Sequence, residues 1–361
     1  MENTGITAPA AIVDVVRDYY GRVLASSKDL KTSACTTSKA PHPLIRAALA
    51  KVPRSVTDKY YGCGSPVPLG IDGLHVLDLG SGSGQDCYVA AALVGPKGSV
   101  TGIDMTAEQL AVARDGIPEF ARTLGYTPKL NFVQGYIELL SDAGVRDSTY
   151  DLVISNCVVN LSPDKRSVLT GVYAALKPGG EFYFSDVYVD RRLPDAVRTH
   201  PVLFGECLGG ALYTEDFRRV CADVGFVDVR VVASAPIDVR DPELVELVGS
   251  AKFVSITYRL FKLKSLEDKC EDYGQVAVYK GTLPGHAHAY ALDAGHNFEA
   301  HKPMLVCGNT AAMVQETWLS PHFTVTGDRS RHFGLFPDCG GAPASSSSSG
   351  GADASSGGNC C

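Results

Sequence analysis

Apolar residues between Leu74 and Val232 fall into short continuous runs that alternate with longer segments of helical periodicity. Runs of this length that are rich in β-branched and aromatic residues are typical of buried strands. The five runs are HVLDLG, SVTGID, LNFVQGY, YDLVISN and EFYFSDV. Strands that alternate with helices predict an α/β fold, in which helices cover both faces of a Rossmann-like parallel sheet.

The segments on either side of this block have different patterns. Apolar residues at helical spacing between Ala11 and Leu24 predict an N-terminal amphipathic helix, followed by a loop rich in Pro, Ser and Thr. TEDFRRVCADVG predicts a helix that ends at Gly225, and FVDVRVV predicts the strand after it. Past Pro236 a short helix near residues 244–248 and a hairpin between FVSITYRLFKL and GQVAVYKG indicate a smaller α+β domain.

The end of the chain, from Gly340, consists almost entirely of Gly, Ser and Ala. Such a segment has too little apolar surface to order itself, which predicts a disordered, flexible tail. The expected domains are 1–56 (N-terminal helix and loop), 57–236 (the α/β domain, with an insertion around 187–212), 237–335 (α+β) and 336–361 (flexible Gly/Ser tail).

Composition narrows the class of protein. A length of 361 residues argues for two or three domains, and 45% hydrophobic residues can bury a sizeable core. A net charge of -7 leaves no basic footprint for nucleic acid or anionic lipid. With no signal-like start and no long apolar run, we expect a cytoplasmic protein without a membrane partner. In that compartment the 11 cysteines favour free, reactive or ligating thiols over a disulfide framework.

A glycine-rich turn follows the first strand, in VLDLGSGSGQD. Glycines at a strand-to-helix turn let the backbone approach a ligand closely, although dinucleotide-binding proteins use a similar turn. Three features favour S-adenosylmethionine: the G-x-G-x-G spacing, Asp78 ahead of the turn, and Asp104 at the end of the next strand, where a carboxylate can accept both ribose hydroxyls. The turn residues expected to contact this ligand are Gly80, Ser81, Gly82 and Gly84. Alternatively, Asp78 caps the turn and Asp104 is a solvated acid.

Two further segments resemble elements of class I methyltransferases. LKPGGEFYFSD is similar to their helix-turn-strand element, and NFVQGYIELL is similar to the strand that ends beside the adenine. The resemblance implies a class I methyltransferase sheet with S-adenosylmethionine as co-substrate. The alternatives, the first of them less favoured, are that Glu138 is an acid at a helix start and that Tyr61 is a core aromatic. The additional cofactor contacts expected are Tyr61, Met105, Ile137, Glu138 and Asn156.

The acceptor side of the predicted site contains thiols. YDLVISN ends at Asn156 and continues into Cys157, at the carboxyl edge of the sheet where open α/β folds bind ligands. A methyltransferase of base amino groups would show Asn or Asp followed by Pro-Pro and an aromatic residue, which SNCVVNL lacks. A second thiol, Cys207, follows in GECLGGAL.

Several separated cysteine segments look like those of the arsenite S-adenosylmethionine methyltransferase family, and the likeness covers roughly residues 10–325. The resemblance implies methyl transfer to trivalent arsenic, first arsenite and then methylarsenite, for arsenic detoxification. It also implies that Cys157 and Cys207 bind arsenic, that Cys63 is a third ligand or redox partner, and that Cys35 pairs with Cys63. The segments are SNCVVNLSPDKR, FGECLGGALY, YYGCGSP, FKLKSLEDKCEDYGQVAVYKGT and HAYALDAGHNFEAHKPMLVCGNT.

Soft-acid chemistry explains why thiols suit this substrate. Trivalent arsenic prefers thiolates to oxygen or nitrogen ligands, as soft metal ions do. Three thiolates leave its lone pair free to attack the donor methyl, which gives a pentavalent product that must be reduced before another methylation. A Cys35–Cys63 disulfide formed in that reduction would be reopened by a thiol reductant, glutathione or thioredoxin, through thiol exchange.

Other interpretations of these residues stay open. Buried cysteines are usually inert, which is expected of Cys87, Cys221, Cys270 and Cys307, and the tail pair Cys360 and Cys361 captures arsenicals or is incidental. The histidines at 286, 288, 296 and 301 suggest a polar loop more than a metal site. Competing functions are a methyltransferase of a small organic acceptor, a thiol protein that only sequesters arsenic, and, least favoured by the glycine spacing, an NAD dehydrogenase.

Overall fold

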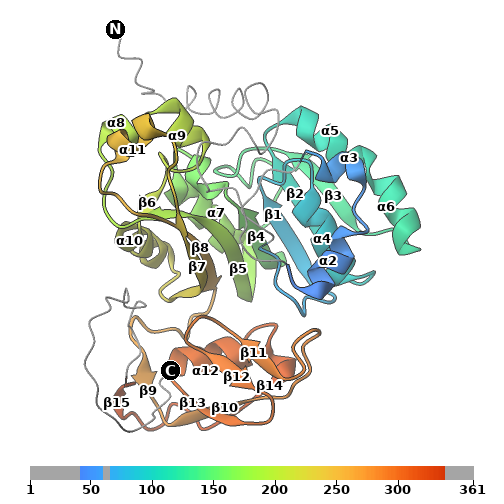
Figure 1. Cartoon of the computed structure of the whole chain (residues 1–361). Helices are drawn as coiled ribbons and strands as arrows, with labels where there is room; N and C mark the ends of the chain where they lie inside the picture. The colour runs from blue at the N-terminus through green and yellow to red at the C-terminus, as the bar shows by residue number, and fades with distance from the viewer. Residues whose placement is uncertain (1–40, 60–65, 338–361) are drawn as a thin grey trace, which may run out of the picture. The chain divides into compact units, whose positions relative to one another are not determined.

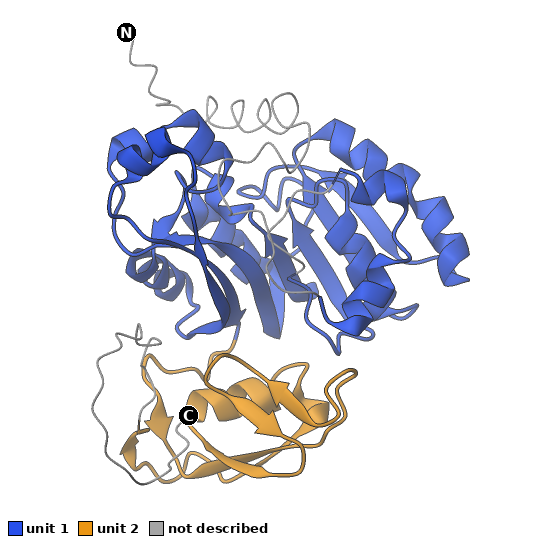
Figure 2. Ribbon diagram, viewed as in Figure 1, with its two compact units in different colours: residues 1–262 blue, residues 263–361 orange. Residues whose placement is uncertain are grey.

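The computed structural model describes residues 41–59 and 66–337, whose course is shown in Figure 1. The chain divides into two compact units between Lys262 and Leu263 (Figure 2). The domain boundary expected at residues 236–237 is therefore wrong, because the strand after it completes the sheet of the first unit. The helix predicted between Ala11 and Leu24 and most of the predicted tail lie outside the described residues.

The first unit is built on an eight-stranded sheet with the order β3-β2-β1-β4-β5-β8-β7, in which β6 pairs with β5. The pairs among β1 to β6 are parallel, whereas β8 is antiparallel to both β5 and β7. The five predicted strands and the strand after Gly225 are confirmed, but the sheet is mixed instead of wholly parallel. The strands are β1 (His75–Leu79), β2 (Ser99–Asp104), β3 (Leu130–Gln134), β4 (Tyr150–Asn156), β5 (Leu176–Val189), β6 (Leu212–Tyr213), β7 (Val229–Ile237) and β8 (Phe253–Phe261).

Helices of the first unit pack on this sheet: α4 against β1 and β2, α5 against β3, and α7 against β5 and α10. Gly225 ends α10 in the left-handed conformation, as its sequence predicts. Turns, and no helix, join β3 to β4, so the helix expected there is wrong. The elements are α2 (Pro43–Leu49), α3 (Arg54–Thr57), α4 (Gln85–Val94), α5 (Ala107–Asp115), α6 (Ile117–Leu124), η3 (Val159–Leu161), α7 (Lys165–Ala175), α8 (Asp195–Arg198), α9 (Pro201–Gly205), α10 (Thr214–Val224) and α11 (Pro242–Val248).

A buried ion pair explains why β8 belongs to the main sheet. The guanidinium of Arg259 in β8 donates from Nε to Glu181 Oε1 at 2.7 Å and from Nη2 to Oε2 at 2.9 Å, on the neighbouring strand β5. Both side chains are almost completely buried. The same guanidinium lies over the rings of Tyr183 and Phe261. A hairpin with GQVAVYKG would leave both charges without this partner, and that predicted hairpin is wrong.

The second unit has the predicted α+β character. Its three-stranded antiparallel sheet has the order β13-β10-β14, α12 packs on all three strands, and two small two-stranded ribbons complete it. The elements are β9 (Glu271–Asp272), β10 (Gln275–Tyr279), β11 (Ala289–Ala291), β12 (Asn297–Glu299), β13 (Pro303–Val306), α12 (Gly308–Gln315), η4 (Ser320–His322), β14 (Phe323–Thr326) and β15 (Gly334–Leu335).

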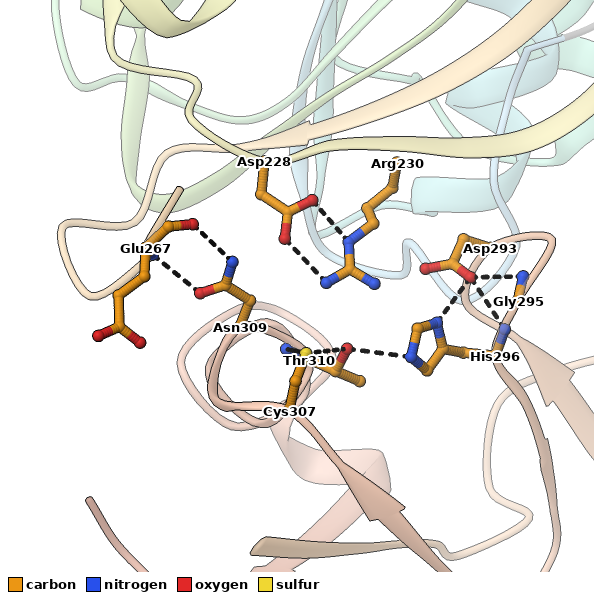
Figure 3. A network of polar contacts seen from close by, with 9 residues as sticks. All are labelled: Asp228, Arg230, Glu267, Asp293, Gly295, His296, Cys307, Asn309 and Thr310. Carbon is orange, nitrogen blue, oxygen red and sulfur yellow. Dashed lines mark hydrogen bonds and ion pairs between the residues drawn. The ribbon is translucent and has the colours of Figure 1, made fainter. Parts of the chain in front are cut away.

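One histidine of the second unit lies in the interior. His296 Nδ1 is 2.8 Å from Asp293 Oδ1, its Nε2 is 3.2 Å from Thr310 Oγ1, and that hydroxyl is 3.3 Å from Cys307 Sγ (Figure 3). His296 lies in the loop between β11 and β12, as the sequence suggested, but its side chain is buried and has a structural role. Within residues 41–59 and 66–337, no group of three or more His, Cys, Asp or Glu side chains could hold a metal ion. No helix in this part of the chain is long and apolar enough to cross a membrane.

Candidate active site at the carboxyl edge of the sheet

The glycine-rich turn joins β1 to α4 and has the predicted geometry. Gly80, Gly82 and Gly84 have φ values of 65°, 51° and 96°, in the left-handed region that favours glycine. A Cβ on Gly80 would lie 2.4 Å from the side chain of Val158, and one on Gly84 would lie 2.8 Å from Phe132. A Cβ on Gly82 would meet nothing within 4 Å. Two glycines thus admit neighbouring side chains, and the third leaves open space above the turn.

Two of the predicted acids flank this turn. Asp78 is buried at the end of β1, and Cys87 Sγ donates to its Oδ2 at 3.1 Å. Burial, followed by the nearby Asp86 and Asp104 carboxylates, raises the pKa of Asp78 well above its usual value. Asp104 accepts hydrogen bonds from the backbone N–H groups of Gly82 and Thr106, each at 2.8 Å. These bonds oppose the effect of burial, which raises the pKa of Asp104. The two acids place carboxyl oxygens beside the turn, where they can accept hydrogen bonds from ligand hydroxyls such as those of a ribose.

Replacement of Asp104 by Asn tests its predicted contact with the ribose. The amide keeps one acceptor for the turn but loses the second charged oxygen, so we expect the Kd for S-adenosylmethionine to rise about tenfold or more, as for a lost charge-assisted hydrogen bond. Calorimetric titration measures this change. Asp115→Asn, at the exposed end of α5, is the matched control and should leave the Kd unchanged. Equal affinity in the two variants would remove Asp104 from the cofactor site.

The other predicted cofactor residues border the same edge. Ser81 Oγ is buried and makes no hydrogen bond with the described residues, a polar atom suited to a ligand hydroxyl. Met105 directly follows β2. Ile137 packs in the main core, and Glu138 beside it is half-buried. Their contacts with the donor stay predictions, and Tyr61 lies outside the described residues.

Asn156 ends β4 and is connected to the glycine turn through a residue that sequence reasoning missed. Its Nδ2 donates to Asp86 Oδ2 at 3.0 Å. Asp86 lies in the first turn of α4 and is only 5% exposed. The available signal was an acidic residue two positions after the last glycine of the turn, at a helix N-terminus where a negative charge is favoured.

The two predicted arsenic ligands, Cys157 and Cys207, lie together. Cys157 follows β4 directly, Cys207 follows α9, and the Cys207 thiol donates to the Cys157 carbonyl oxygen at 3.1 Å. Both have left-handed backbones, with φ of 56° and 66°. Besides these two, Ser148 and His301 are the non-glycine residues with positive φ in the described part of the chain. Strained conformations of this kind cluster at functional sites.

The glycines of GECLGGAL explain how the second thiol reaches the first. A Cβ on Gly210 would lie 2.0 Å from the carbonyl oxygen of Asn160, in η3 just after Cys157. A Cβ on Gly209 would lie 3.0 Å from the backbone of Phe204 in α9. The segment with Cys207 therefore approaches the turn after Cys157 more closely than any larger residue permits.

The described cysteines differ in their disulfide state and in the pKa of their thiols. Cys157 takes part in a disulfide, whereas the thiols of the other described cysteines, Cys87, Cys207, Cys221, Cys270 and Cys307, are reduced. Burial raises the pKa values of Cys87 and Cys221, which keeps both thiols neutral, as expected of inert core residues. Cys35, Cys63, Cys360 and Cys361 lie outside the described residues, so the predicted Cys35–Cys63 pairing and the ligand role of Cys63 stay predictions.

This chain is similar in sequence to proteins that are named arsenite methyltransferases. The arsenite methyltransferase of Aquipseudomonas alcaligenes is 53% identical over 326 residues, which cover 90% of this chain and 94% of that protein. The human arsenite methyltransferase is 42% identical over 320 residues, or 88% of this chain and 84% of that protein. This chain belongs to the arsenite methyltransferase family. The resemblance inferred from the cysteine segments is confirmed.

Comparison with solved structures also supports membership of the arsenite methyltransferase family. The crystal structure of an arsenic(III) S-adenosylmethionine methyltransferase from Chlamydomonas reinhardtii is 61% identical in sequence, with a TM-score of 0.80. It covers 82% of this chain and is itself matched over its full length. A family profile for a methyltransferase domain matches residues 71–225, which include the glycine turn and both thiols. The predicted Rossmann-like methyltransferase fold is confirmed.

A network of polar contacts around Asp186 and Lys165 supports the turn after Cys157. These two residues were not identified from the sequence. Asp186 accepts hydrogen bonds from the N–H groups of Asn160 at 2.9 Å and Val187 at 2.8 Å. Lys165 Nζ donates to the carbonyl oxygens of Asn160 at 3.1 Å and Ser162 at 2.9 Å. Burial raises the pKa of Asp186 to about 6 and lowers that of Lys165 to about 8. These contacts fix the backbone that Gly210 approaches.

Proposed function

We propose that this chain transfers methyl groups from S-adenosylmethionine to trivalent arsenic held by Cys157 and Cys207. One observation supports the proposal above the others: the two thiol residues are in contact, and the neighbours of Cys157 on both sides contact the glycine-turn region. Asn156 is hydrogen-bonded to Asp86, and Val158 lies against Gly80. A thiol-bound arsenic there lies beside the expected position of the methyl donor.

The chemistry requires positioning more than proton transfer. Bound S-adenosylmethionine supplies an electrophilic methyl group on a sulfonium. Cys157 and Cys207, as thiolates, hold arsenic and leave its lone pair free, and the strained loops hold those sulfurs in place. A new As–C bond forms as the S–CH3 bond breaks, arsenic is oxidised from the trivalent to the pentavalent state, and S-adenosylhomocysteine leaves. Such displacements depend on near-attack geometry, and no general base is needed because arsenic carries no proton.

Arsenic binding at Cys157 requires that its disulfide be reduced, and the pentavalent product requires two further electrons. We assign both to a thiol reductant, glutathione or thioredoxin, acting by thiol exchange in the cytoplasm. Cys63 would complete the ligand set, and Cys35 would form a disulfide with it. The described residues do not include either cysteine, and their roles come from the family resemblance.

A Cys35→Ser variant tests that redox role. We expect it to lose arsenite methylation at least about tenfold while methylarsenite methylation falls less, because only the first substrate would depend on the Cys35–Cys63 exchange. Initial rates with each arsenical, under the same reductant, give the comparison. An equal loss on the two substrates would remove the distinct redox role of Cys35 and leave methyl transfer itself in place.

Product speciation tests the proposed function directly. The protein is incubated with arsenite, S-adenosylmethionine and glutathione, and arsenicals are separated and identified by mass spectrometry. We expect methylarsenicals and stoichiometric S-adenosylhomocysteine. Donor consumption with small amines or phenols in the absence of arsenic would indicate an organic acceptor, and arsenic binding without donor binding would indicate a sequestering protein. Either result would overturn the proposal.

A further inference from the structure

Cys157 has an unusual backbone conformation and lies between two residues that contact the glycine turn. Its backbone φ is 56°, a value that residues other than glycine rarely adopt. Its N–H donates to the carbonyl oxygen of Ser185 on β5, at 2.8 Å. Asn156 and Val158, on either side, each contact the region of the glycine turn. The loop is therefore attached at two points, one polar and one apolar, to the element expected to bind the methyl donor.

The polar attachment is a buried carboxylate. Asp86 lies in the first turn of α4, two residues after Gly84, and accepts a hydrogen bond from the Asn156 amide at 3.0 Å. A buried carboxylate is costly without hydrogen bonds, so this contact stabilises both partners. The Asp86 charge also contributes to raising the pKa of Asp78 across the turn. Asp86 thus links the start of the cofactor helix to the end of the strand that carries the arsenic ligand.

The apolar attachment is a close contact with glycine. A Cβ on Gly80 would lie within 2.4 to 2.9 Å of three side-chain atoms of Val158. The Val158 side chain therefore occupies the space that any other residue at position 80 would need. Together the two contacts hold the residues on both sides of Cys157 against the turn, in addition to its disulfide and its hydrogen bond to Ser185.

We propose that Asp86 is a positioning residue for methyl transfer: through the Asn156 amide it holds Cys157 at the distance from the glycine turn that the bound arsenic needs. The inference rests on the proposed function. Asp86 acts here as a hydrogen-bond acceptor that orients Asn156. A displacement of about 1 Å from near-attack geometry can cost about a hundredfold in rate, so loss of this acceptor should lower kcat more than it changes KM.

Four variants separate this role from a general effect on the fold. Asp86→Leu removes the acceptor with a side chain of the same branching, and Asp86→Asn keeps an acceptor without the charge. Asn156→Asp places two carboxylates in contact, and Asn156→Asp combined with Asp86→Asn restores an amide facing a carboxylate with the partners exchanged. Measured for each are kcat and KM with arsenite at saturating S-adenosylmethionine, the Kd for the donor, arsenic bound per chain, and Tm.

We expect D86L to lower kcat about tenfold or more and D86N to stay within about threefold of the wild type, since only the first loses the hydrogen bond. N156D should lower kcat about a hundredfold, because two adjacent carboxylates repel, and the added D86N should recover at least about tenfold of that loss. Arsenic stoichiometry should be unchanged throughout. Asp115→Leu, which removes an exposed carboxylate from α5, should match the wild type.

Two results would overturn the inference: wild-type kcat in D86L, or an exchanged double variant no faster than N156D alone. If D86L does not fold, the comparison of N156D with the double variant decides alone. Failure of the wild-type protein to methylate arsenite under the same conditions would instead contradict the proposed function. The two failures are thereby distinguished.

Discussion

Serine at position 157 or 207 is expected to abolish methylation of both arsenite and methylarsenite, by about a thousandfold or more, because a hydroxyl is a far poorer ligand for a soft centre than a thiolate. The two sulfurs belong to loops in direct contact, so loss of either leaves arsenic with an incomplete ligand set. S-adenosylmethionine binding should be retained within about twofold, since the glycine turn and its acids are unchanged.

The measurements are methylated product by mass spectrometry and donor affinity by calorimetry. Cys221→Ser is the matched control: this thiol is equally buried, but it lies in α10 and packs in the main core instead of the Cys157–Cys207 cluster. It should lose stability by about 1–3 kcal/mol, the cost of an unsatisfied buried hydroxyl, and keep its activity. Full activity in either ligand variant would contradict the arsenic site.

The main strands were predictable because each is a run of buried apolar residues whose pattern is local. HVLDLG, SVTGID and YDLVISN became β1, β2 and β4 with nearly the expected bounds. The position of β8 was not predictable in this way. Its central Arg259 makes FVSITYRLFKL look half-polar, and the partner that permits its burial, Glu181, is 78 residues earlier in the chain. The local sequence pattern contains the charge of Arg259 but not the opposite charge of Glu181 that compensates it.

The same limit applies to the site. Local signals identified the glycine turn, Asp78, Asp104 and the thiol motifs. The contacts that hold these parts together join residues far apart in sequence, and each partner alone looks ordinary. Asp86 resembles any acid in the first turn of a helix, and its hydrogen bond to Asn156 spans 70 residues. In the sequence Asp186 is likewise an ordinary acid within a strand. Only the structure shows that the N–H of Asn160, 26 residues earlier, donates to its carboxylate.

Gly210→Ala is expected to lower arsenite methylation about a hundredfold, because the backbone that carries Cys207 must shift to accommodate one methyl group. The added Cβ would lie 2.0 Å from the carbonyl oxygen of Asn160. That oxygen also accepts a hydrogen bond from Lys165, and the N–H of Asn160 donates to the buried Asp186. The obstacle is therefore backbone fixed by two hydrogen bonds, one buried and one partly buried, so the Cys207 segment has to move away from Cys157.

Gly125→Ala supplies the control for Gly210→Ala. Gly125 ends α6 with φ of 76°, and a Cβ there meets nothing within 4 Å. Gly125→Ala should lower the free energy of unfolding by about 1 kcal/mol through backbone strain and leave activity unchanged. Arsenic bound per chain and kcat, measured on folded protein of each variant, separate the two cases. Wild-type activity in Gly210→Ala would mean that the segment with Cys207 can yield, and that close approach to Asn160 is not what places the second thiol.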